Sequence, residues 1–101
     1  MDKKCKIEYL PIAEQDLNDI IEYIIIDHPD AAIRVANQID ESVSTLKAFP
    51  YMGSVPNDPR LQALQYRFIV VEPYLIFYVI NNDTIEIRRI LHGKRRYSFL
   101  L

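Results

Sequence analysis

Two successive stretches of the chain repeat apolar residues at helical spacing. The first begins at Pro11, a residue that suits the first turn of a helix, and ends near Asp27. Pro29 begins the second, which ends before Pro50. The apolar stripes are Ala13, Leu17, Ile20, Ile21 and Ile24, then Ala32, Val35, Ala36, Ile39, Val43 and Leu46. Because so few residues separate the stretches, the sequence predicts an antiparallel helical hairpin whose two stripes face one core.

Alternating or β-rich runs on both sides of this hairpin predict strands. Pro and Gly mark residues 50–60 as a loop, and Asn and Asp mark residues 81–83 as a turn. The expected strands are residues 4–9, 66–71, 74–80 and 84–91. The order β-α-α-β-β-β predicts α+β architecture in a single small domain over residues 1–101. We expect a mainly antiparallel sheet with the helical hairpin packed on one face.

Composition narrows the classes of protein that fit. Of the 101 residues, 50% are apolar and 26% are charged, which is typical of a folded domain rather than a disordered chain. No apolar run approaches the roughly 18–20 residues of a membrane span, and no secretory signal is visible. The single Cys5 excludes an internal disulfide and a Cys-based zinc site, and the two histidines are far apart. We expect a cytoplasmic protein that binds no membrane, metal or cofactor.

The small net charge of −2 conceals two regions of opposite sign. Residues 11–48 hold two basic and eight acidic residues, a net charge of −6. Residues 88–101 hold no acid and a net charge of +5, carried by Arg88, Arg89, Lys94, Arg95 and Arg96. Such a basic cluster indicates either an anion-binding or nucleic-acid surface, or a solvated tail.

Three further side chains are candidates for function. Arg67, between Tyr66 and Phe68, either faces solvent or lines a concave surface. Arg89 shares its expected strand face with Ile85, Ile87 and Leu91, so its charge needs a partner: a carboxylate from the hairpin or the start of the chain, unless the residue lines a groove. Tyr97 stacks on a base, donates a proton or holds the tail against the sheet.

Four segments occur in an order typical of a known group of proteins. They are YLPIAEQDLNDIIEYI, LKAFPYMGSVP, YRFIVVEPYLIFYVINNDTIEI and RRILHGKRRY. Over roughly residues 6–98 the chain resembles the RelE/ParE superfamily of toxins from bacterial type II toxin–antitoxin systems, which serve in plasmid stabilisation and growth arrest. The resemblance implies this fold, a cognate antitoxin as partner, and either a homodimer or a toxin–antitoxin hetero-oligomer.

Members of the superfamily have one of two activities, and the resemblance implies different site residues for each. RelE-like members are ribosome-dependent mRNA endonucleases; here Arg95 and Tyr97 would be the catalytic residues. ParE-like members bind DNA gyrase. In either branch the residues expected to hold the target or RNA are Arg67, Arg88, Arg89, Lys94 and Arg96.

Missing cations favour the ParE-like branch. The endonuclease pattern has an arginine before its aliphatic-Tyr run, where this chain has Tyr74 followed by Leu75. The lysines of the preceding strand correspond roughly to Tyr66 and Phe68. We therefore expect a gyrase-binding toxin, with an RNA-cleaving toxin as the alternative and a non-toxic relic that still binds its antitoxin as a third reading.

Overall fold

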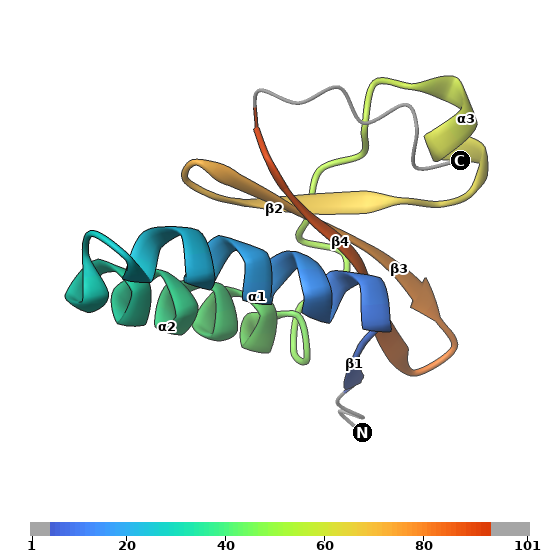
Figure 1. Ribbon diagram of the computed structural model, residues 1–101. Coiled ribbons are helices and arrows are strands. Elements are labelled where there is room, and N and C mark those ends of the chain that lie inside the picture. The colour runs from blue at the N-terminus through green and yellow to red at the C-terminus, as the bar shows by residue number, and fades with distance from the viewer. Residues whose placement is uncertain (1–4, 94–101) are drawn as a thin grey trace.

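The computed structural model describes residues 5–93, in which a helical hairpin covers one face of a four-stranded sheet (Figure 1). The elements are β1 (Lys6–Tyr9), α1 (Pro11–Ile25), α2 (Pro29–Thr45), α3 (Pro59–Ala63), β2 (Arg67–Val71), β3 (Tyr74–Asn81) and β4 (Thr84–His92). The predicted α+β class and the order of the hairpin and strands are confirmed. The addition is α3, a single short helix at the end of the stretch expected as a loop.

The sheet has the order β1-β4-β3-β2. β1 runs parallel to β4, with Ile7 opposite Ile85, and the other two pairs are antiparallel, so the expected mainly antiparallel sheet is confirmed. Since β1 and β2 lie at opposite edges, the chain between them must cross the sheet, and the hairpin makes that crossing over one face. α1 packs on α2 and β4, and α2 also reaches β2.

Both helices begin at a proline, as the sequence predicts. Pro11 and Pro29 occupy the first turns, where a missing backbone N–H costs nothing because that N–H has no partner within the helix. Among residues 5–93, no helix is both long and apolar enough to cross a membrane.

The main core lies between the hairpin and the sheet. From the predicted stripes, Ile39 and Leu46 are fully buried, while Leu17 and Val35 are half-buried and pack against the same cluster. The strand side chains in this core are Ile69, Val71, Ile76, Tyr78, Ile85, Ile87 and Ile90. The predicted packing of the stripes against one face of the sheet is thereby confirmed.

A second, smaller cluster covers the opposite face of the sheet. Phe77 alternates with Ile76 and Tyr78 along β3, so its ring projects away from the hairpin. The cluster consists of Leu61, Tyr66, Phe77 and Leu91, with Phe68, Leu75 and Val79 packed against it. Leu61 comes from α3, which lies on this side of the sheet (Figure 1).

A β-bulge in β4 changes which side chains face the hairpin. Phe77 lies opposite Arg89 but Tyr78 lies opposite Ile87, so Arg88 is an extra residue in β4. The extra residue shifts the alternation: Ile85, Ile87 and Ile90 enter the main core, and Leu91 enters the second cluster. The expectation that Arg89 and Leu91 share a face with Ile85 and Ile87 is wrong for this reason, because their partners on β3, Phe77 and Leu75, belong to the second cluster.

We predict that truncating Ile39 to alanine destabilises the fold strongly. Ile39→Ala removes a fully buried side chain from the main core and should lower the free energy of unfolding by about 2–5 kcal/mol. Ile33→Ala on the same helix is the matched control, because Ile33 is 61% exposed and should change stability by under about 1 kcal/mol. Equilibrium urea denaturation measures both; equal losses would contradict the assignment of the buried face of α2.

Candidate functional site

The structure separates the predicted binding arginines rather than gathering them. Arg67 begins β2, whereas Arg88 and Arg89 lie at the bulge in β4, and β3 runs between the two strands. The other predicted site residues lie outside the described residues: Lys94, Arg95, Arg96 and Tyr97.

Arg89 is paired with a carboxylate from the hairpin. Its Nε donates to Asp16 Oδ2 at 2.7 Å and its Nη2 donates to Asp16 Oδ1 at 3.0 Å. The backbone N–H of Ile90 donates to the same Asp16 Oδ2 at 3.0 Å. This bidentate pairing raises the pKa of Arg89. Of the alternatives that the sequence left open for Arg89, a carboxylate from the hairpin is the one found.

Arg88 projects toward the second cluster. Its Nη2 lies 3.1 Å from Glu86 Oε1, and its guanidinium carbon lies 5.8 Å from the centroid of the Tyr66 ring. Its Nε is buried and has no hydrogen-bond partner among the described residues. Arg88 and Arg89, the two arginines at the bulge, are therefore each paired with a carboxylate of the same chain.

The segment after α2 is fixed to the sheet by Tyr78. The fully buried Tyr78 hydroxyl donates to the Pro50 carbonyl at 2.7 Å and accepts from the Gly53 N–H at 3.0 Å. Burial raises the pKa of Tyr78. Ser54 then pairs with Phe68 through two backbone hydrogen bonds of 2.8 and 2.9 Å. A Cβ at position 53 would lie 2.5 Å from the Tyr78 hydroxyl oxygen, so this approach requires glycine.

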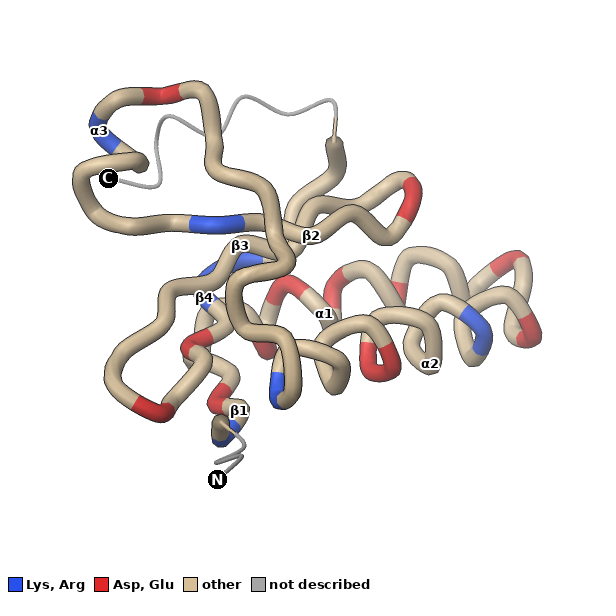
Figure 2. Tube along the Cα trace, turned by 180° about the vertical axis from the view of Figure 1, so that it is seen from behind, with Lys and Arg blue, Asp and Glu red and all other residues tan. Residues whose placement is uncertain are grey.

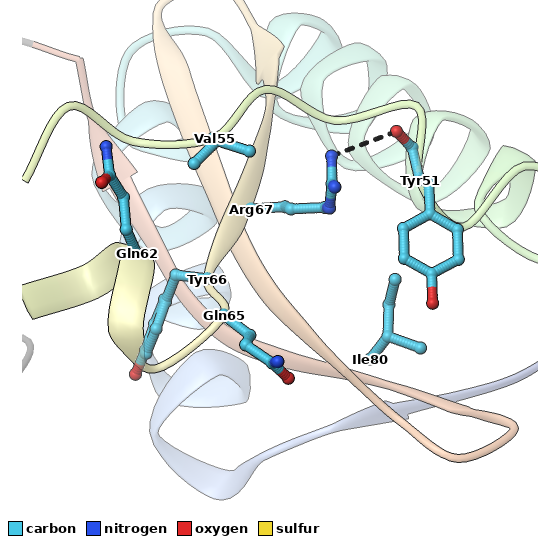
Figure 3. A pocket seen from close by; sticks show the side chains of 7 residues that line it. All are labelled: Tyr51, Val55, Gln62, Gln65, Tyr66, Arg67 and Ile80. Carbon is cyan, nitrogen blue, oxygen red and sulfur yellow. Dashed lines mark hydrogen bonds between the residues drawn. The ribbon is translucent and has the colours of Figure 1, made fainter. Parts of the chain in front are cut away.

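The same segment holds Arg67 in place. Arg67 Nη1 donates to the Gly53 carbonyl at 2.9 Å and to the Tyr51 carbonyl at 3.3 Å, and the guanidinium carbon lies 5.1 Å from the centroid of the Tyr51 ring (Figure 3). Beside it is a pocket of about 240 Å³, which we call the Arg67 pocket. Its lining residues are Tyr51, Val55, Gln62, Gln65, Tyr66, Arg67 and Ile80.

A wider groove on the hairpin side is acidic. It measures about 410 Å³ and is lined by Tyr9, Glu14, Leu17, Asn18 and Asp40. Burial and the charge of Asp40 raise the pKa of Tyr9 to about 12. Acidic positions are spread along both helices (Figure 2). Among residues 5–93, no three His, Cys, Asp or Glu side chains gather where they could hold a metal ion.

Comparison with known families covers nearly the whole chain. The family described as "ParE toxin of type II toxin-antitoxin system, parDE" matches residues 7–97. The chain belongs to the ParE toxin family. It is therefore a toxin of a type II toxin–antitoxin system, and the resemblance found in the sequence is confirmed on the ParE side.

Two individual proteins resemble this toxin, one in sequence and one in fold. The toxin is 30% identical over 96 residues to the Sinorhizobium fredii protein named "Putative toxin Y4kP", covering 95% of this chain and 96% of that protein. Its fold is similar to a solved structure described as "Chromosomal ParDE TA system from P. aeruginosa", with a TM-score of 0.75 and 21% identity. That match covers 91% of this toxin and 99% of that chain.

The contacts explain why the four sequence segments occur together in this toxin. The Asp-Leu of the first segment supplies Asp16, which binds Arg89 in the last segment. Pro50 and Gly53 of the second segment bind Tyr78 in the third. Polar contacts therefore join the first segment to the last and the second segment to the third.

We predict that Asp16→Asn destabilises the toxin. The amide keeps the shape of the carboxylate but loses its charge, and one of its two acceptor atoms becomes a donor that faces Arg89 or Ile90. Because both side chains of the pair are less than 20% exposed, the free energy of unfolding should fall by about 1–3 kcal/mol. Asp19→Asn, at an exposed neighbour on α1 whose carboxylate accepts from Gln15, should have little effect. Equal losses in chemical denaturation would contradict the role of the pair.

We also predict that the Tyr78 hydroxyl stabilises the loop over residues 50–56. Tyr78→Phe leaves the Pro50 carbonyl and the Gly53 N–H without their partner and should cost about 1–3 kcal/mol of unfolding free energy. The exchange rates of backbone amides in this loop should rise as well. Tyr51→Phe, on an exposed ring, is the control and should change neither quantity; unchanged exchange in Tyr78→Phe would contradict the prediction.

Proposed function

We propose that this toxin arrests growth by binding DNA gyrase, that a cognate antitoxin neutralises it, and that it does not cleave RNA. The main support for this choice is the aromatic second cluster, which includes Tyr66 and has Phe68 packed against it, the two positions that correspond roughly to the endonuclease lysines. A ParE-like mechanism needs a binding surface, whereas RNA cleavage needs a set of charged and proton-donating groups.

The positions that correspond to the endonuclease lysines are occupied by packed rings. Tyr66 and Phe68 lie against Phe77, with ring centroids 6.5 and 5.6 Å from it. Tyr66 is only 6% exposed. Rings at these two positions offer no positive charge to the phosphorane that forms when a ribose hydroxyl attacks the neighbouring phosphate. Arg88 lies over Tyr66, but Glu86 offsets its charge.

The antitoxin proposal rests on the family and on the charge distribution. The solved structure with the similar fold is described as a ParDE system, and the family is that of parDE toxins. The acidic hairpin and the basic end of the chain offer two oppositely charged docking areas. A segment that is disordered alone and folds on the toxin can reach both areas. We place the complex in the cytoplasm, as a hetero-oligomer.

Induced expression in bacteria tests the proposed target. We predict growth arrest with gyrase-dependent DNA breaks and with mRNA that primer extension finds uncut. Tyr97→Phe should remain toxic, because a binding surface keeps the contact area of the ring. Cuts at codon positions that disappear in Tyr97→Phe would instead assign the toxin to the RNA-cleaving branch.

Two other outcomes of the same expression experiment are informative. A protein that causes no arrest but still binds the antitoxin is the non-toxic relic. If the toxin is active, neutralising Lys94, Arg95 and Arg96 together should weaken toxicity more than any single change, because each cation supplies a fraction of the affinity.

A further inference from the structure

Arg67 carries unused hydrogen-bonding capacity in a fixed position. Its Nη1 donates to two carbonyls, and no partner is recorded within residues 5–93 for its Nε or Nη2. The Tyr51 ring and the two carbonyls already restrict the rotation of the side chain. A guanidinium that is held in place binds an anion at a lower cost in side-chain entropy than a free one does.

The lining of the Arg67 pocket suits an anion that belongs to a side chain. None of the seven lining residues that the structure describes is acidic, although the chain as a whole has a net charge of −2. Gln65 brings an amide, and the Tyr51 ring, Val55 and Ile80 supply apolar contact (Figure 3). A carboxylate on a short aliphatic stem matches this combination in charge, polarity and size.

Among the described residues, no strand pairs with the edge of β3 beyond the start of β2, and this stretch of edge adjoins the pocket. Arg67 pairs with Tyr78, and Ile80 lies beyond the start of β2, where Gln65 leaves the strand direction with a φ of 63°. The backbone N–H and C=O of Phe68 bond to Ser54, on the side away from β3. Because successive residues of a strand direct these groups to opposite sides, the N–H and C=O of Arg67 point toward β3. The same alternation along β3 directs the backbone N–H and C=O of Ile80 to the side that β2 has vacated. An extended peptide can bond there.

A nucleic-acid phosphate fits the pocket less well than a peptide does. Arg67 is the only cation among the lining residues that the structure describes, and the neighbouring hairpin is acidic, whereas nucleic-acid strands are held by several cations along the backbone. A peptide needs only one acidic side chain and the strand edge.

We propose that the Arg67 pocket receives an Asp or Glu side chain from an extended segment of the antitoxin, whose backbone bonds to β3 at Ile80. This inference rests on the proposed antitoxin partner and adds the site and the chemistry of one contact. It assigns to Arg67 a role in binding a protein rather than RNA.

Opposite charge changes at Gln65 test the proposal without touching Arg67, whose loss would also release the loop. The probe is the purified cognate antitoxin, titrated calorimetrically into the toxin at low and high salt. Gln65→Lys should tighten binding and Gln65→Glu should weaken it, each by about 2–5-fold at low salt and less at high salt. Gln38→Lys and Gln38→Glu, at an exposed position on α2, control for the change in net charge and should shift affinity by less than about twofold.

The titrations have four outcomes, and each either supports or overturns the proposed contact at Arg67. Opposite shifts confined to Gln65 support the proposal. Shifts of the same sign in both Gln65 variants, or shifts no larger than those at Gln38, overturn it while leaving the antitoxin as partner. Absence of any antitoxin binding by the unaltered toxin overturns the proposed partner and the inference with it. A short single-stranded RNA whose affinity follows the charge at Gln65 would show that the pocket serves nucleic acid, which also overturns the proposal.

Discussion

The carboxylate of Asp16 is the contact on which the arrangement of the two layers depends. It binds Arg89 and the backbone of Ile90 at once, and so fixes α1 to β4 directly after the bulge. The bulge in turn determines that Ile90 enters the main core and Leu91 the opposite cluster. A charge that is mostly removed from water needs such a partner, and the partner here lies 73 residues away in the chain. One pairing therefore joins the hairpin, the bulge and both apolar clusters.

A second polar contact, made by the Tyr78 hydroxyl, positions the residues that line the Arg67 pocket. Tyr78 projects from β3 into the segment after α2 and fixes Pro50 and Gly53, and that segment supplies the carbonyls that hold Arg67. The shape of the Arg67 pocket therefore depends on the buried Tyr78 hydroxyl as well as on the residues that line the pocket. The opposite face of the sheet is covered by the aromatic second cluster, whereas the Arg67 pocket and the acidic groove have polar linings.

The sequence predicts the elements of this fold well because their signals are periodic. The stripes through Ile39 and Leu46 and the prolines at both helix starts are local features, and the need of Arg89 for a partner follows from its apolar neighbours. The bulge at Arg88 has no such signal, since an extra residue in a strand is visible only against its partner strand. The Arg67 pocket was also beyond prediction: its lining comes from a loop, a short helix and two strands that only the tertiary contacts bring together.

We propose that this member of the ParE family acts on gyrase as a binding protein. Packed rings occupy the positions of Tyr66 and Phe68, and of the described arginines expected to hold a target, Arg88 and Arg89 pair with carboxylates and Arg67 lines the pocket. The most direct measurement is the supercoiling of relaxed plasmid by purified gyrase, titrated with the purified toxin. We predict that supercoiling falls as toxin is added and recovers when the antitoxin is supplied. Full supercoiling in the presence of excess folded toxin that still arrests growth in cells would contradict it.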